Sequence, residues 1–294
     1  MINAKNKIEF CIADNIAHYL GYKQNKEAIG FLFLTMDVLG FKYNGIRGSC
    51  YEILNGLNGD SREFINRCFD FYTFEKEVIN TTDILKSKIE NIMLEIDDYY
   101  LESSPFFQKY HHLRYVNLLK NETNECEIYD MGLISVERKN LKRIAVSGCL
   151  VKNKENFNVN VNIANMISDK IIISEQKPSI INSLLIFKDE LLNVIQGLQS
   201  DDFYNLFFFT NKVGGPAQIR NSSYIALNML FKYITKNKEK IQMKIDVLNR
   251  LKSEWIVLGN TFFRMSKLMN SNIVVRIINQ LDVIIELEKQ FQLL

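Results

Sequence analysis

Proline is scarce in this sequence, with three in 294 residues. Because proline interrupts helices and central strands, its scarcity argues against disordered linkers and favours long unbroken elements. The sequence also lacks a run of about eighteen apolar residues, the length that a membrane-spanning helix requires. Its longest apolar patch, YNLFFFTN at 204–211, is far shorter. We therefore expect no membrane segment.

Cysteine is also infrequent. The five cysteines stand at positions 11, 50, 68, 126 and 149. Their odd number, wide spacing and lack of a CxxC motif predict neither a disulfide framework nor a structural zinc site. Glu9 and Asp14 interrupt the opening segment, which is not typical of a signal peptide. We expect a cytoplasmic protein with no metal and no cofactor, in which a cysteine is a small buried hydrophobe or a nucleophile.

Charge is balanced, with 36 basic and 34 acidic residues and a net charge of +2. A nucleic-acid-binding protein is expected to show a strongly basic face, so this balance argues against nucleic acid as a partner. The hydrophobic share of 47% and the charged share of 24% are ordinary for a soluble globular protein.

The N-terminal half has mixed helix and strand patterns. FCIADNIAHYLGY has an apolar stripe at helical spacing, and Gly21 is a plausible C-cap. Residues 89–97 predict a strand, and 114–121 with 125–131 predict a hairpin joined by the polar NETN. A short helix is expected to begin at Ser135 or Val136.

After about residue 165, apolar residues recur every three or four positions, which predicts helices. We therefore predict an α+β protein with a catalytic domain at 1–150 and a helical subdomain at 151–294 that covers the active site.

Cys11 is the first candidate for chemistry, because it lies at the start of the first predicted helix. The partial positive charge of a helix N-terminus lowers a thiol pKa, and its free N–H groups can stabilise an oxyanion. The thiolate needs a histidine base, and the histidine needs an orienting group. His18 is seven residues further on, roughly 10 Å away along the helix, which is too far. The candidates that remain are His111 or His112 as base and Asp130 as the orienting carboxylate.

A structural interpretation competes with this one. A cysteine ahead of a helix is more often a core residue, and a histidine at the entrance of a strand is more often a surface residue. Composition and spacing alone favour the structural interpretation.

The order of several motifs resembles the N-terminal-like family of the butirosin biosynthesis protein BtrH. The motifs are FCIADNIAHYLGY, DDYYLESSPFFQKYHH at 97–112, the strand pair that ends at Asp130, and later GGPAQIRNSSYIALNMLF with Trp255. The resemblance implies a papain-like cysteine-peptidase fold followed by a mostly helical region. It also implies a thiol acyltransferase of antibiotic biosynthesis, in which Cys11 takes an acyl group from a carrier-protein thioester. An amine then accepts the group and forms an amide bond.

The sequence departs from the family pattern at the base. In the family the histidine directly precedes the apolar strand, and here that position is Arg114, which cannot accept a proton. Side chains alternate along a strand, so His112 points the same way as Arg114 and His111 the opposite way. His112 is therefore the preferred base, with His111 as its alternative. Arg114 and Tyr100 of the YYLE motif are candidate substrate-binding residues.

Three functions remain open. The first is acyl transfer from a phosphopantetheine-bearing carrier protein to an amine. The second is a non-catalytic binding protein in which Arg114 has replaced the base and pairs with a ligand carboxylate or phosphate. The third is a cysteine peptidase or hydrolase, which uses the same chemistry with water as the acceptor.

Overall fold

The computed structural model describes the chain except residues 1–7, 9, 23–24, 37–41, 44, 47–52, 55–60, 87–89, 105–106, 110, 112, 155–156, 174–177 and 212–214. The chain divides into two compact units. The sheet unit is Phe10–Met36 with Gly59–Val159, and the helical unit is Met1–Glu9, Asp37–Asn58 and Asn160–Leu294. The segment 37–58 therefore groups with the C-terminal helices and not with the rest of the first 150 residues. The fold class is α+β, as the sequence predicts.

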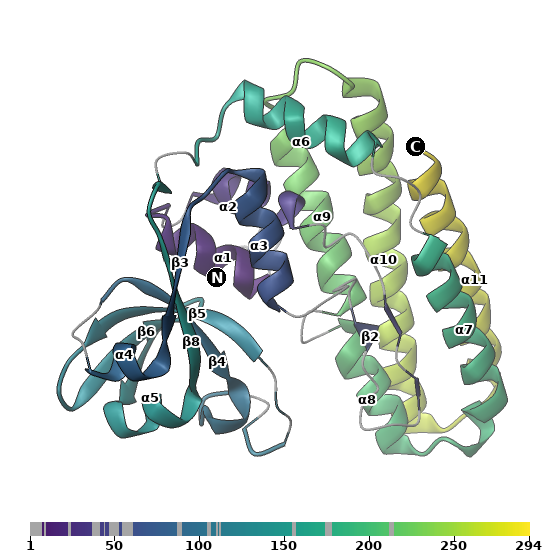
Figure 1. Cartoon of the computed structure of the whole chain (residues 1–294). Helices are drawn as coiled ribbons and strands as arrows, with labels where there is room; N and C mark the ends of the chain where they lie inside the picture. The colour runs from purple at the N-terminus through teal and green to yellow at the C-terminus, as the bar shows by residue number, and fades with distance from the viewer. Residues whose placement is uncertain are drawn as a thin grey trace, which may run out of the picture. The chain divides into compact units, whose positions relative to one another are not determined.

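Within its described residues, the sheet unit holds a six-stranded antiparallel sheet in the order β3-β8-β4-β5-β6-β7 (Figure 1). The strands are β3 (Lys76–Asn80), β4 (Ile92–Asp97), β5 (Leu113–Asn121), β6 (Glu125–Tyr129), β7 (Leu133–Glu137) and β8 (Ala145–Val151). Strands β5 and β6 pair with Leu118 opposite Ile128, which confirms the predicted hairpin.

The prediction of a helix beginning at Ser135 or Val136 is wrong, because both residues lie in β7. Val136 pairs with Cys126 of β6 and is buried, whereas its neighbours on either side are more exposed. That alternation has the two-residue period of a strand. The helix begins two residues after Val136, as α5 (Arg138–Ile144).

Helices complete the described part of the sheet unit. They are α1 (Cys11–Tyr19), α2 (Lys26–Thr35), α3 (Ser61–Phe71), α4 (Thr81–Lys86) and α5, with a short 3₁₀ turn, η2 (Asp98–Tyr100). Ile84 of α4 and Leu141 and Ile144 of α5 join Val116 and Leu118 of β5 in one buried apolar cluster. This cluster joins α4 and α5 to the sheet, below it in Figure 1.

The helical unit contains the predicted C-terminal helices. They are α6 (Val161–Ile173), α7 (Pro178–Val194), the 3₁₀ turn η4 (Ile195–Gly197), α8 (Ser200–Asn211), α9 (Pro216–Phe231), α10 (Lys238–Leu268) and α11 (Ser271–Leu293). A two-stranded ribbon of β1 (Lys42–Tyr43) and β2 (Ile53–Leu54) belongs to the same unit. The ring of Tyr43 packs on Phe187 of α7 with ring centroids 5.1 Å apart, which explains why the ribbon groups with these helices. None of the described helices has a stretch both long and apolar enough to cross a bilayer.

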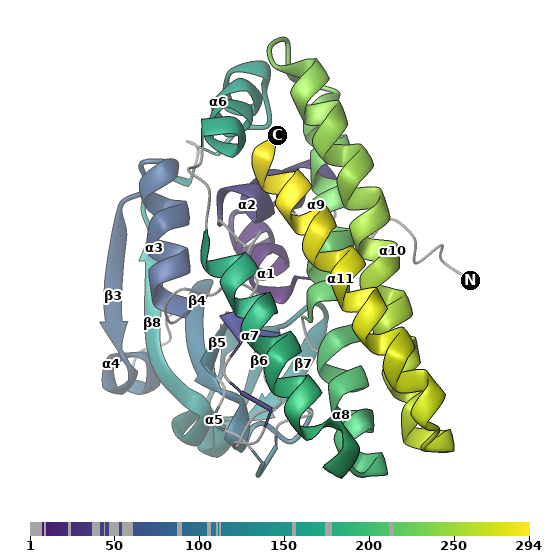
Figure 2. The same ribbon diagram turned by 90° about the vertical axis from the view of Figure 1, so that its right-hand side faces the viewer.

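Helix α10 runs beside α8, α9 and α11 (Figure 2). Its Trp255 is fully buried, and the indole N–H donates to Glu288 of α11 at 3.4 Å. Arg220 of α9 donates to both oxygens of the same carboxylate, at 2.8 and 2.6 Å. An ion pair therefore lies inside the apolar interior of these helices.

Lys244 of α10 provides a pH-dependent prediction. Its ammonium donates to the backbone carbonyl of Phe291 at 2.8 Å, and burial, with a smaller contribution from Lys240, lowers its pKa to about 8. The pKa of lysine in an unfolded chain is about 10.4, so between these two values the unfolded chain binds more protons. The free energy of unfolding should therefore rise as the pH rises from about 8 to about 10.5.

The measurement is urea unfolding of wild type and Lys244→Met at about pH 7 and about pH 10. We expect the free energy of unfolding of wild type, relative to that of Lys244→Met, to be higher at about pH 10 than at about pH 7. Lys236→Met, at an exposed position, is the control and should show no such shift. A pH-independent difference for Lys244→Met would contradict the assignment.

Candidate functional site

Cys11 is the first residue of α1, as the sequence predicts. The helix ends as expected too, because Gly21 has a φ of +90° and the N–H of Tyr22 donates to the carbonyl of Ala17 at 2.8 Å. Phe10 precedes the helix and makes no side-chain cap hydrogen bond to the N–H groups of the first turn. The backbone of Ile12 lowers the pKa of Cys11 by hydrogen bonding.

Arg114 of β5 binds two carboxylates and is near enough to Cys11 to influence the pKa of its thiol. Its Nε donates to both oxygens of Asp98, at 2.7 and 2.8 Å, and its Nη1 donates to Asp130. Arg114 is 9% exposed and Asp98 is 2% exposed. Burial works against the charge of Arg114, but the two carboxylates outweigh burial and raise its pKa. The guanidinium is therefore permanently charged, and it pairs with two carboxylates.

Taken together, the groups around Cys11 do not lower the pKa of its thiol. Burial is the largest influence and raises its pKa to about 11, with Asp130 and Asp98 adding to the rise and Arg114 opposing it. The sequence predicted a lowering by the helix N-terminus; the hydrogen bond from the Ile12 backbone acts in that direction but is the smallest of these influences. At neutral pH the sulfur is a neutral thiol, which is a weak nucleophile.

Asn15, one helical turn after Cys11, was not predicted from the sequence. Its amide donates to the carbonyl of Tyr115 at 2.8 Å and to Asp130 at 3.2 Å, and its oxygen accepts from the N–H of Met131 at 3.3 Å. Asn15 is completely buried, so these bonds fix α1 against β5 and the end of β6. The available signal was a polar residue on the apolar side of the helix, four positions after Cys11.

Asp98 was also missed. It begins η2 directly after β4, and Asp97 caps this turn by accepting from the N–H of Tyr99 at 3.0 Å. The sequence signal was a pair of aspartates that follows a strand. Which of the two turns inward is decided only when η2 folds.

The described histidines pair with groups other than Cys11. His111 Nδ1 lies 2.7 Å from Asp97, its ring stacks on Tyr99, and its side chain is 64% exposed. His18 stacks on Tyr129, and its Nδ1 lies 3.3 Å from the amide of Asn117. His112, the preferred base in the sequence prediction, lies outside the described residues.

Tyr100, the second predicted substrate-binding residue, stands at the end of η2. Its ring is partly exposed and contacts Tyr99, and the guanidinium of Arg143 lies 5.8 Å from the ring centroid. Tyr100 is therefore a surface neighbour of His111, with ring centroids 6.0 Å apart.

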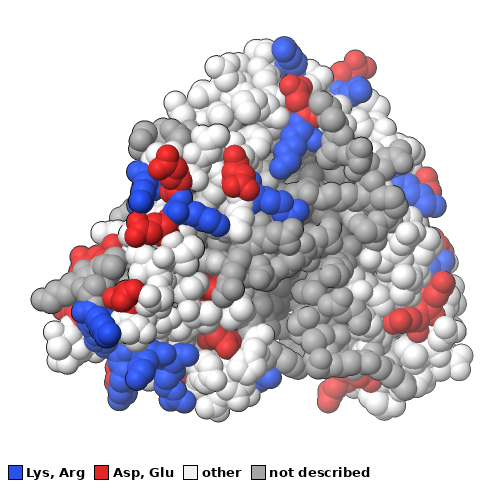
Figure 3. All heavy atoms as spheres, in the orientation of Figure 1, with Lys and Arg blue, Asp and Glu red and all other residues white. Residues whose placement is uncertain are grey.

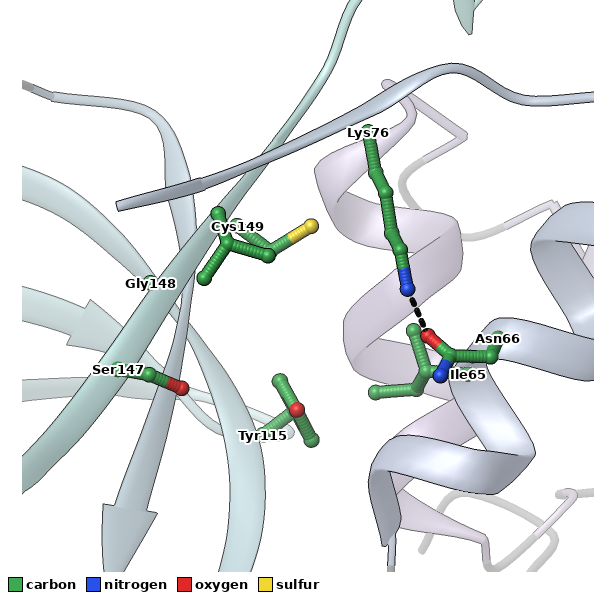
Figure 4. A pocket seen from close by; sticks show the side chains of 8 residues that line it. Ile65, Asn66, Lys76, Tyr115, Ser147, Gly148 and Cys149 are labelled. Atoms are coloured by element: carbon green, nitrogen blue, oxygen red, sulfur yellow. Dashed lines mark hydrogen bonds between the residues drawn. The ribbon is translucent and has the colours of Figure 1, made fainter. Parts of the chain in front are cut away.

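A pocket of about 340 Å³ opens in the same unit (Figure 4). Its lining consists of Ile65, Asn66, Lys76, Val78, Tyr115, Ser147, Gly148 and Cys149. Lys76 contacts the amide oxygen of Asn66, and Ser147 donates to the buried Glu95 at 2.8 Å. Burial raises the pKa of Cys149 to about 11, and Lys76 opposes this rise. The pocket offers apolar walls, two hydroxyls and one cation to a small ligand.

No family model and no curated protein matches this chain. The part of the chain that the structure describes contains no group of three His, Cys, Asp or Glu placed to hold a metal ion. The fold and the site define an α+β protein in which the buried pair Arg114–Asp98 and the partly buried Cys11 and Asp130 lie near the start of α1.

Proposed function

We propose that this protein is a non-catalytic binding protein, built on the cysteine-peptidase-like arrangement that its sequence resembles. The observation that carries the proposal is the position of Arg114, which binds Asp130 and is near enough to Cys11 to influence its pKa. In a thiol enzyme a histidine base stands between the cysteine and the orienting carboxylate. An arginine in that place cannot accept a proton, so it cannot activate the thiol.

The pocket beside β3 and β8 supports a binding role. Its lining mixes hydroxyls, Lys76 and apolar side chains, which suits a small ligand with an apolar part and one acidic group. Arg114 itself does not need a ligand carboxylate or phosphate, because it already pairs with Asp98 and Asp130. The ligand site and the Arg114 cluster therefore have separate roles, recognition for the first and stability for the second.

Acyl transfer from a carrier-protein thioester to an amine is the second candidate. The observation that favours it is that Cys11 starts a helix and lies near Asp130, as the nucleophile and the orienting acid of a thiol acyltransferase would. In that function, the Cys11 thiolate displaces the pantetheine thiol and an amine then displaces Cys11. A peptidase would use water in the second step.

Thiol alkylation distinguishes the two candidates. Since the pKa of Cys11 is about 11, its alkylation by iodoacetamide at neutral pH should be slower than that of an ordinary thiol. With an ordinary thiol pKa of about 8.5, the expected slowing is about two orders of magnitude, and the rate should keep rising with pH. Peptide mapping by mass spectrometry follows Cys11, with Cys11→Ser as the control for the assignment.

An activated site would behave differently. Fast alkylation at about pH 6, with a pH-independent plateau, would contradict the binding proposal and support a thiolate paired with a base. An acyl adduct on wild type but not on Cys11→Ser, after incubation with an acyl N-acetylcysteamine thioester, would establish acyl transfer. Arg114→His supplies the missing base and, where circular dichroism shows that it folds, should alkylate faster than wild type.

A further inference from the structure

The sheet unit has a second pocket, of about 520 Å³, where α4, the β5–β6 turn and α5 meet. Its lining consists of Thr82, Leu85, Lys86, Thr123, Arg138, Lys139 and Lys142. Figure 3 shows basic side chains gathered at the lower left, where Figure 1 places α4 and α5. This concentration is local, because the whole chain carries a net charge of only +2.

The positive charge of this pocket is largely unbalanced. None of its lining residues is acidic. Lys139 pairs with Glu137 at 2.6 Å, but among the described residues no carboxylate forms an ion pair with Lys86, Arg138 or Lys142. Elsewhere in the same unit, Lys120 and Lys152 do have carboxylate partners, Glu127 and Glu77.

Arg138 gives the pocket a fixed cation. Its Nη1 donates to the carbonyl of Glu122 at 2.7 Å and to that of Asn121 at 3.4 Å, and its Nη2 donates to the carbonyl of Leu85. The side chain thus ties α4 to the β5–β6 turn. Backbone carbonyls orient the guanidinium but carry no net charge, so its positive charge remains available to an anion.

We propose that this pocket binds a small phosphorylated molecule that carries two or more phosphate charges. Four cationic side chains line one hollow, Lys86 from α4 and the other three from α5, and Thr82 and Thr123 add hydroxyl groups beside them. Arginine, lysine and hydroxyl groups together are the donors that phosphate oxygens accept best. Cations grouped around a hollow suit a compact anion, whereas a long acidic chain would be matched by a row of cations along a surface. The proposal does not depend on the reactivity of Cys11.

Isothermal titration calorimetry of the full chain with inorganic pyrophosphate tests the proposal. We expect saturable binding that weakens as salt is added. Lys86→Ala and Lys142→Ala should each weaken it by about tenfold, the loss typical of one charge-assisted hydrogen bond. Glu137→Gln should tighten binding, because it releases Lys139 from its carboxylate. Lys152→Ala removes an exposed lysine outside the pocket and should leave the affinity unchanged.

These variants change exposed side chains, and circular dichroism will show that each remains folded. Absence of saturable binding to wild type at millimolar pyrophosphate would overturn the proposal. Equal affinities of wild type and the Lys86→Ala, Lys142→Ala double variant would overturn it as well. An RNA oligonucleotide that binds more tightly than pyrophosphate, and equally well to the double variant, would replace it with a diffuse nucleic-acid surface.

Discussion

Replacing Arg114 with alanine should lower the free energy of unfolding by about 3–5 kcal/mol, because it leaves the buried carboxylate of Asp98 without its counter-charge. Asp98 is 2% exposed, and Arg114 donates to both of its oxygens. The same substitution removes the guanidinium that holds Asp130. Urea unfolding at neutral pH, followed by far-ultraviolet circular dichroism, measures the loss.

A surface ion pair on the same strand provides the matched control. Lys120 pairs with Glu127, and their side chains are 52% and 38% exposed. Lys120→Ala should cost less than about 1 kcal/mol, since solvent screens such pairs. A similarly small loss for Arg114→Ala would show that Asp98 and Asp130 become hydrated in the variant, and the cluster would then not stabilise the fold.

Arg220→Ala should destabilise the helical unit by a comparable amount, about 3–5 kcal/mol. Glu288 is completely buried, and the substitution removes the two hydrogen bonds that it accepts from Arg220. Trp255 is the single tryptophan of the chain and donates to the same carboxylate. Its fluorescence during urea unfolding therefore reports on this site directly.

Two further variants show whether an unpaired buried charge or lost packing causes that loss of stability. Lys289→Ala removes an exposed cation of α11 whose distance to Glu286 is 3.8 Å, and it should have little effect. The double variant Arg220→Met, Glu288→Leu removes both buried charges and should recover most of the stability that Arg220→Ala loses. If the double variant is as unstable as the single one, packing and not an unpaired charge explains the loss.

Local patterns in the sequence were sufficient for much of the fold. The helix that begins at Cys11 and ends at Gly21 follows from an apolar stripe and a C-cap glycine, both of which act within a few residues. The β5–β6 hairpin and the C-terminal helices follow from the same kind of short-range information. The prediction of a helix at Ser135 was wrong because this segment forms a strand only by pairing with β6. A short apolar run does not distinguish a strand from a helix.

The sequence by itself therefore determined the α+β class and placed Cys11 at a helix start, because periodicity and capping are local properties. The sequence could identify Arg114 as a departure from a family pattern, but it could not supply the partners of that arginine. Asp98 is 16 residues from Arg114 in the sequence, and Asn15 is 115 residues from the Asp130 that it binds. Only the tertiary structure brought these side chains together and buried them, and burial is the largest reason why the pKa of Cys11 rises to about 11.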